Sequence, residues 1–463
     1  MQMPRFAVPE ALVTEILSKL PVKSVIRFNC VCKYWCSSFQ TPHFISNNYH
    51  NNLKNNSLIP LLQRFDGNAD LAFFSQLSVV KDENFLVKQN IHFPFFIHDS
   101  PYVWGARHGL FCLHSSCMED TEVAIWNPST REFKILPPSS VQRPTYPGLT
   151  CDLVVFDCGA FEFDFKADDY KFIRFVTFLF VDSECGIESP DDVTQVELYS
   201  LKCDSWKEIP SPNYRPFNSY LNNNCLDGIC YWQTAMGNSP DEKVMILSFD
   251  MANEKFSVSP ILEFVPFFSK TNSEVLVFNG SVGVLVYSVE GIDKSFDLWV
   301  MNGGVWTKQF SIESIPGVVN PLGFWKNDEL FLLNTNYEVV LFDPSTQELK
   351  VLGINTYLDH HREYVSLFFY VESLVSINGI QEHKDHIIRQ LVGDASNIDQ
   401  LYSQPLPRVV SHAWPLRHHE QLPPYGRFSI EPARIAPITE NKPADDRKKL
   451  ENIDQVETQY DNG

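Results

Sequence analysis

Apolar residues recur at helical spacing near the N-terminus, and further along the chain they form spaced pairs and short continuous runs that are typical of strands. In the first stretch the apolar positions that recur at helical spacing are Leu12, Val13, Ile16, Leu17 and Leu20. Pro9 suits the first turn of a helix, where its missing N–H leaves no bond unmade. Pro21 stops the helix. The pattern therefore predicts a short helix between these two prolines.

A second helix is predicted after Pro21, with Ser24 as its N-cap and Arg27 and Phe28 in its first turns. Its apolar stripe consists of Val25, Phe28, Val31, Cys32 and Trp35, followed by Phe39 and Phe44 on either side of Pro42. Two or three helices of this length bury too little surface to be stable alone. We expect a partner to cover part of their apolar surface. The alternative is an ordinary N-terminal helical hairpin packed on the main domain.

The order of residues in this stretch resembles the F-box, a short helical module that docks an adaptor. The matching residues are Pro9, Leu12, Glu15-Ile16-Leu17, Leu20-Pro21, Lys23-Ser24, Arg27-Phe28, Cys30-Val31-Cys32-Lys33, Trp35, Pro42 and Phe44. The chain departs from the pattern with Val8 and Val25 for leucine, Asn29 for a basic residue and Tyr34 for a small or basic one. The resemblance implies a surface that docks a Skp-type adaptor, which in turn binds a cullin. The residues implied at or near that surface are Val8, Pro9, Leu12, Ile16, Leu17 and Pro21.

Five later segments each place two large apolar residues seven positions apart, with turn-forming residues between them. The pairs are Trp126 and Phe133, Tyr199 and Trp206, Phe249 and Phe256, Trp299 and Trp306, and Phe342 and Leu349. Each pair predicts a β-hairpin whose two apolar residues face each other across the strands. The first residues of successive pairs lie 73, 50, 50 and 43 residues apart. Repeats of this length predict a β-propeller of about six blades, with a β-sandwich as the alternative.

Short apolar runs ahead of the hairpins predict buried inner strands. These runs are 109–113, 228–232, 282–287 and 329–333, and the 73-residue gap holds further runs at 153–156 and 174–180. The segments 365–371 and 374–377 are predicted to be closing strands, paired with strands near 58–62 and 71–74. The blades would then close through strands from both ends of the domain.

The repeated units resemble the F-box-associated, kelch-like domain of plant F-box proteins. The resemblance rests on phrases such as 126–133, 196–201, 204–207, 298–301, 324–330 and 370–375. Their order is similar to that of the S-locus F-box group. In that group the C-terminal domain captures secreted basic ribonucleases of the pistil for ubiquitination, in gametophytic self-incompatibility. Relatives in the wider family have other targets, so the resemblance leaves both open.

Three regions follow: an F-box over 1–50, a kelch-like propeller over 51–379, and a tail over 380–463. The tail departs from the family, whose members usually end near the equivalent of Asn378. Prolines interrupt any periodic pattern in it, and we expect it to be disordered.

The net charge of −20 lies entirely in the middle region. Residues 1–50 hold five basic and two acidic residues, and residues 380–463 hold ten and thirteen, so residues 51–379 carry 22 basic and 42 acidic ones. An acidic body repels nucleic acid and anionic membranes, and it steers a basic protein partner toward itself. A solubility bias without any partner is the alternative.

The sequence shows no stretch of 18 uncharged apolar residues and no signal peptide. Its eleven cysteines lack paired spacing, which predicts reduced thiols and a cytoplasmic location, with the nucleus as the alternative.

Candidate chemistry is sparse. The sequence has no Gly-x-Ser-x-Gly elbow, no phosphate-binding glycine loop and no His-Glu-x-x-His. Cys30, Cys32, Cys36 and His43 fit no usual zinc spacing, and we expect a packed, reduced face there. We predict no catalytic residue, no metal and no cofactor. The first hypothesis is a non-catalytic substrate receptor of a Skp–cullin–F-box ubiquitin ligase. The alternatives are a propeller enzyme and an F-box scaffold that assembles no ligase.

Overall fold

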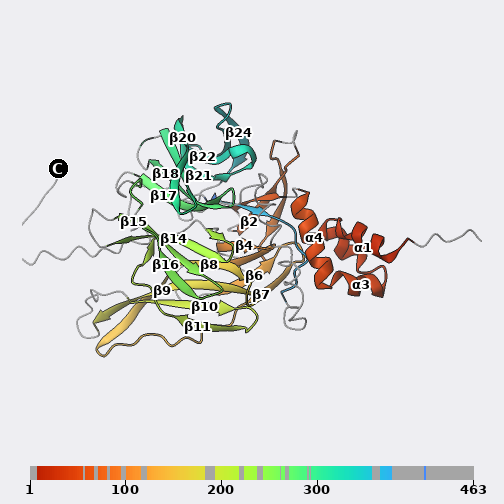
Figure 1. Ribbon diagram of the computed structural model, residues 1–463, viewed down its shortest axis with the longest axis horizontal. Helices are drawn as coiled ribbons and strands as arrows, with labels where there is room; N and C mark the ends of the chain where they lie inside the picture. The colour runs from red at the N-terminus through yellow and green to blue at the C-terminus, as the bar shows by residue number, and fades with distance from the viewer. Residues whose placement is uncertain are drawn as a thin grey trace, which may run out of the picture. The chain divides into compact units, whose positions relative to one another are not determined.

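The computed structural model describes most of the chain up to residue 377 (Figure 1). The described residues are 8–55, 58–66, 71–80, 84–94, 101–115, 122–182, 193–217, 224–236, 243–260, 262–265, 271–288, 291, 293–356, 365–377 and 411–412. The predicted disorder of 380–463 falls outside these ranges, apart from the two-residue strand β26 (Ser411–His412).

Four helices form an N-terminal helical module: α1 (Glu10–Ser18), α2 (Val22–Phe28), α3 (Lys33–Phe39) and α4 (Pro42–Lys54). Prolines begin three of them, since Pro9 and Pro21 are the N-caps of α1 and α2 and Pro42 is the first residue of α4. The prediction that Ser24 caps the second helix is therefore wrong, because Pro21 starts α2 early and leaves Ser24 inside its first turn. Thr41 caps α4 by accepting the Phe44 N–H at 3.4 Å. The module's core consists of Leu17, Val25, Phe39 and Phe44.

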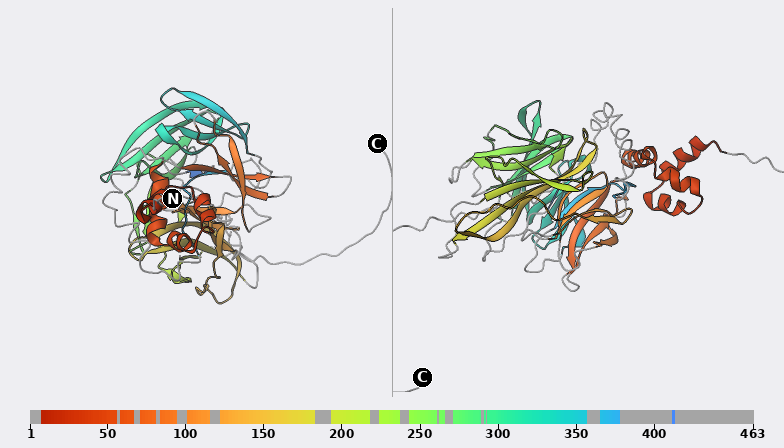
Figure 2. Two further views of the ribbon diagram at one scale, coloured as in Figure 1. Left: turned by 90° about the vertical axis from the view of Figure 1, so that its right-hand side faces the viewer. Right: turned by 90° about the horizontal axis from the view of Figure 1, so that it is seen from below.

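Six antiparallel sheets succeed one another along the chain, so the predicted β-propeller of about six blades is confirmed and the β-sandwich is excluded. Figure 2 shows the sheets from several directions, in colours that run from orange to blue. We number the blades from the sheet that contains both N-terminal and C-terminal strands. Blade 1 has β1 (Ile59–Asp66), β2 (Leu71–Leu77), β3 (Val87–His92), β25 (Ser366–Tyr370) and β26. Blade 2 has β4 (Tyr102–Arg107), β5 (Leu110–His114), β6 (Val123–Asn127) and β7 (Glu132–Ile135). Blade 3 has β8 (Leu149–Asp164), β9 (Asp169–Asp182), β10 (Val193–Ser200) and β11 (Ser205–Ile209).

The remaining blades repeat the same antiparallel order. Blade 4 has β12 (Pro216–Phe217), β13 (Cys225–Leu226), β14 (Ile229–Met236), β15 (Lys243–Asp250) and β16 (Lys255–Val258). Blade 5 has β17 (Thr271–Phe278), β18 (Ser281–Ser288), β19 (Asp293–Asn302) and β20 (Val305–Pro316). Blade 6 has β21 (Val318–Phe324), β22 (Leu330–Asn334), β23 (Glu338–Asp343) and β24 (Glu348–Asn355), with a 3₁₀ turn η1 (Lys326–Asp328) before β22.

Blade 1 closes the ring with strands from both ends of the domain. β25 pairs with β1 in antiparallel register, with Tyr370 opposite Ile59. The predicted closing strand at 365–371 is thus confirmed. The second predicted strand, 374–377, is wrong: this segment lies outside any sheet, because its backbone groups bond instead to side chains of blade 2.

Four of the five predicted hairpins have the predicted register. The facing pairs are Trp126 with Phe133, Tyr199 with Trp206, Phe249 with Phe256, and Phe342 with Leu349. Their four-residue turns end on a left-handed residue, at Arg131, Asp204, Glu254 and Gln347. The fifth pair is shifted by two positions, so that Trp299 faces Lys308. Gly303 and Gly304, both at positive φ, make a two-residue turn there.

Chain direction assigns every turn to one of two faces of the propeller. In each blade, the turn between the first and second strands and the turn between the third and fourth strands lie on the same face. We call this the near face; examples are the turns β4–β5, β6–β7 and β8–β9. The far face carries the other connections. The helical module contacts the near face, where the Tyr49 ring on α4 meets His108 in the β4–β5 turn edge-on at 5.6 Å between centroids.

A disulfide joins Cys225 and Cys230 across the β13–β14 hairpin, so the prediction that all thiols are reduced is wrong. The two cysteines are five positions apart in the sequence and lie directly opposite each other on the two paired strands. Cys30, Cys32 and Cys36 remain free, and the first two are exposed rather than packed as expected. Within the described ranges, no helix combines the length and apolar character needed to cross a membrane.

Candidate functional site

An exposed apolar stripe runs along one side of α1. The side chains of Val8, Leu12 and Ile16 are 56%, 49% and 59% exposed, although each is large and apolar. Leu12 and Ile16 are four residues apart on α1, which places them one above the other on the helix, and Val8 lies just ahead of Pro9, the N-cap of α1. Pro9 and Pro21 are exposed as well. Five of the six residues that the sequence implied for docking therefore lie on the surface of the helical module.

Leu17 is the exception, because it is 6% exposed and belongs to the core of the helical module. Val13 of α1 and Leu20, just beyond its end, pack against the same core. The sequence pattern grouped Leu17 with Ile16 because both are apolar. The structure separates them, since consecutive positions on a helix point about 100° apart. We assign Leu17 a supporting role, holding α1 in place from beneath.

Two further large apolar residues of the helical module are exposed, and the sequence did not single them out for docking. Tyr34 lies at the start of α3 beside the first turn of α1, and a hydrogen bond to Glu10 raises its pKa. Val31 is 59% exposed in the turn between α2 and α3. Its neighbours Phe28 and Trp35 are packed inward as predicted. The sequence placed Val31 in the apolar stripe of the second helix, and this is wrong, because α2 ends at Phe28 and leaves Val31 exposed in the following turn.

The helix α4 belongs to the helical module and to the propeller at once. Phe44 lies in the module's core, whereas its neighbour Ile45 lies in the hydrophobic core formed by blades 2 to 4. One and two turns further on, Tyr49 and Leu53 pack against the core between blades 1 and 6. The helix runs through the predicted domain boundary at residue 50. The two regions consequently share a packed interface.

Buried ionisable side chains lie inside the blades, and several of them form ion pairs. In blade 3 the Arg174 guanidinium lies 2.8 Å from the Glu197 carboxylate, between the rings of Trp206 and Phe156 at 4.2 and 4.5 Å. Burial lowers the pKa of His114 to about 3, so this imidazole is neutral at physiological pH. These groups are enclosed and paired, which favours a structural role. Among the residues that the structure describes, no three His, Cys, Asp or Glu side chains gather as metal ligands would.

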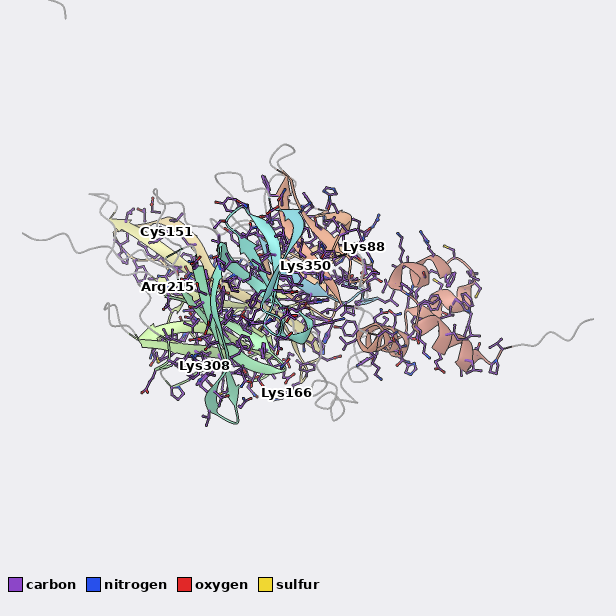
Figure 3. The ribbon with its side chains drawn as sticks, turned by 90° about the horizontal axis from the view of Figure 1, so that it is seen from above. Lys88, Cys151, Lys166, Arg215, Lys308 and Lys350 are labelled. Atoms are coloured by element: carbon purple, nitrogen blue, oxygen red, sulfur yellow. A yellow bond between two sulfur atoms is a disulfide. The ribbon has the colours of Figure 1, made fainter. Side chains whose placement is uncertain are left out.

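The far face presents carboxylates to solvent. Those on described, exposed residues are Glu122, Asp152, Glu208, Glu263, Asp293 and Glu313. Basic side chains on this face are engaged: Arg215 lies 2.9 Å from Asp157, and Arg143 pairs with Glu197. Figure 3 shows Arg215 and Cys151 at the end of the propeller away from the helices. On the near face, Lys207 is exposed beside the β10–β11 turn and pairs with Glu254 at 2.6 Å.

Comparisons with known proteins agree with this architecture. Residues 107–377 match the family model described as F-box associated beta propeller domain, and residues 7–47 match the F-box domain. F-box protein CPR1 of Arabidopsis thaliana is 27% identical over 374 residues, which cover 75% of this chain and 84% of that protein. A putative F-box/kelch-repeat protein of the same plant is 24% identical over 318 residues, covering 66% and 71%. Among solved structures, a PL25 ulvan lyase has a TM-score of 0.37 at 8% identity, with 65% and 71% covered, which is too low to inform function.

Proposed function

The chain belongs to the F-box-associated β-propeller family, with an F-box ahead of the propeller, and from this premise we propose that it is a substrate receptor of a Skp–cullin–F-box ubiquitin ligase. The observation that carries the proposal is the exposed stripe formed by Leu12 and Ile16 on the F-box helix α1 and by Val8 just before it. A soluble surface rarely leaves such side chains aligned and uncovered unless a partner covers them. The partner proposed here is a Skp-type adaptor, which links the chain to a cullin.

The chain's part in ubiquitin transfer is to hold a protein substrate close to the ubiquitin-carrying enzyme. Proximity alone raises the rate of a transfer reaction by orders of magnitude, so the receptor needs no acid, base or nucleophile. The paired, buried charges in the blades fit this role, since they are enclosed by the sheets they stabilise. We propose residues 1–50 as the docking region and 51–379 as the substrate-binding region, acting in the cytoplasm.

Adaptor binding by the purified chain tests the docking proposal directly. Burying a side chain such as Leu12 or Ile16 contributes about 1.5 to 3 kcal/mol, so Leu12→Asp with Ile16→Asp should weaken adaptor binding at least about 100-fold. Val351→Asp is the matched control, because Val351 is 52% exposed on the propeller strand β24. The proposal predicts that this control binds like the wild type. Equal adaptor affinity for the double variant and the wild type would show that α1 is not the docking helix.

We further propose that the substrate is a basic protein that binds the far face. Exposed carboxylates of several blades lie on that face, while Arg143 and Arg215 there are paired with acidic groups. Attraction between opposite charges at a protein surface weakens as salt is added. Candidate basic proteins should therefore lose affinity at least about tenfold between 0.05 and 0.5 M salt. An affinity that is flat across this range would contradict a charge-driven interaction.

From the resemblance to the S-locus F-box group we propose secreted basic ribonucleases of the pistil as the substrate. Titration of the purified chain with such a ribonuclease, beside a basic protein of equal charge and unrelated fold, tests this narrower proposal. Preferential binding of the ribonuclease supports it. Equal binding of both proteins would mean that the chain selects its substrate by charge alone, and would contradict the assignment of ribonucleases as the substrate.

A further inference from the structure

Residues 371–377 follow β25 of blade 1 and run between the F-box helices and the near face of the propeller; we call them the closing strap. Blade 2 holds one side of the strap. The Asn127 side-chain amide donates to the carbonyl oxygens of Ser373 and Val375, at 3.1 and 2.8 Å. The Ile377 N–H donates to Glu132 at 2.8 Å. The strap's path is thus fixed by side chains of a single hairpin, β6–β7.

The F-box helices bond to the other side of the strap, at Glu372. The Glu372 carboxylate accepts the Val22 N–H at 3.2 Å, in the first turn of α2. N–H groups in a first helical turn have no partner within the helix, and Pro21 at the N-cap has no side-chain group to offer. The Glu372 carbonyl oxygen accepts the Asn52 side-chain amide of α4 at 3.5 Å. One residue therefore binds two of the four helices.

Side chains of α4 extend this bonding to the docking helix. The buried Asn48 amide donates to the carbonyl oxygens of Ser18 and Leu20 at the end of α1, at 3.0 and 2.9 Å. Its own oxygen accepts from Asn52 at 3.3 Å, which is the amide that also reaches Glu372. A chain of hydrogen bonds therefore runs from the end of α1, through α4, to the strap.

Apolar packing follows the same route. Leu374 packs against the core of the helical module and also against the core shared by blades 2 to 4. Gly109 in the β4–β5 turn lies so close beneath the strap that a Cβ atom there would be 2.3 Å from the Ser373 Cβ. The strap is tightly enclosed on both sides.

We propose that the closing strap, through Glu372, fixes the orientation of the adaptor-docking helices relative to the propeller. The strap takes this position only when β25 pairs with β1, because it continues directly from β25. Closure of the propeller and orientation of the F-box are then one event, although the groups involved lie 350 residues apart. Glu372 is a positioning residue.

The consequence for ubiquitin transfer rests on the proposed function. An adaptor bound to α1 would hold the cullin in a fixed direction from the far face. The ubiquitin-carrying enzyme would then reach only those substrate lysines that lie within a limited zone. With the strap released, the docking helices would keep their own fold and their affinity for the adaptor, and the zone would widen.

Distance measurements between the two regions test the proposal without a substrate. Spin labels attached through non-canonical amino acids at the exposed positions Lys33 on α3 and Lys350 on β24 report the F-box-to-propeller distance in the full chain. Glu372→Ala should widen the distance distribution about twofold, because the strap then loses its hydrogen bond to the Val22 N–H of α2. Glu372→Gln keeps an acceptor oxygen and should restore the narrow distribution. An unchanged width in Glu372→Ala would overturn the proposal.

Two controls separate positioning from general loss of structure. Glu348→Ala removes an exposed carboxylate from β24 and should leave the width as in the wild type. Asn52→Ala removes the α4 contact without altering the strap and should also widen the distribution.

Adaptor affinity should stay within about twofold for Glu372→Ala, since the α1 stripe is intact. A matching loss of affinity and of helical signal would assign Glu372 to folding of the module and overturn the positioning role. If the wild type binds no adaptor, the ligase proposal fails, and the distances still decide the role of the strap.

Discussion

Replacing Glu274 with glutamine should stabilise the protein, by an amount that grows with pH. Glu274 lies on β17, the first strand of blade 5, and is fully enclosed between blades. The Tyr287 hydroxyl donates to its carboxylate at 2.8 Å. Burial outweighs this bond and raises the pKa of Glu274 from 4.5 to about 8. The folded protein therefore holds a proton that the unfolded chain releases.

The sign and size of the effect follow from this pKa. Between the unfolded value of 4.5 and the folded value of about 8, the folded state binds more protons, so the free energy of unfolding falls as pH rises. At about 1.4 kcal/mol per pKa unit, the loss between pH 5 and pH 8 is roughly 3 to 4 kcal/mol. Glutamine has no proton to lose. The stability gained by Glu274→Gln should therefore be larger at pH 8 than at pH 5 by this amount.

Urea unfolding followed by tryptophan fluorescence at pH 5 and pH 8 measures this difference. Comparing the variant with the wild type at each pH cancels other titrating groups. Glu348→Gln, at an exposed position on β24, is the control and should show no pH-dependent gain. A Glu274→Gln gain that is equal at the two pH values would refute the reasoning, because it would mean that Glu274 titrates alike in the folded and unfolded states.

Three other substitutions test the packing. Leu17→Asp should unfold the F-box, because Leu17 is in its core, and loss of the helical circular dichroism signal measures this; a retained signal contradicts it. Arg174→Met should lower the free energy of unfolding by about 1.5 to 3 kcal/mol, since Glu197 loses its buried partner and keeps only the pair with Arg143; a urea-unfolding change below about 1 kcal/mol contradicts this. Gly109→Ala should cost at least about 1 to 2 kcal/mol, because φ is +80° and Ser373 blocks the methyl group; an unchanged melting temperature contradicts this.

The repeating hairpins were predictable because each is a local feature. Two apolar residues flank turn formers, and the facing pairs such as Trp126 with Phe133 follow from strand alternation. The exception was also local. Gly303 and Gly304 form a tighter turn than the four-residue turns elsewhere, and this shifts Trp299 by two positions. Attention to the two glycines in the sequence could have revealed the shorter turn.

The closing strap and the sides of α1 depend on contacts that no local pattern carries. An apolar run at 374–377 predicts a strand, yet Asn127 takes up the backbone oxygens that a neighbouring strand would otherwise bind. Ile16 and Leu17 are both apolar, and only the position of the other helices shows which one is covered. The bond between Glu372 and Val22 joins residues too far apart in the sequence for either to predict the other.

Assembly of the chain with the adaptor and the cullin tests the central claim most directly. The three purified proteins are mixed and separated by size-exclusion chromatography with light scattering. The account predicts one complex that contains a copy of each, and predicts that the Leu12→Asp and Ile16→Asp double variant elutes apart from the adaptor–cullin pair. A wild-type chain that elutes alone, away from both partners, would contradict its role as a ligase receptor.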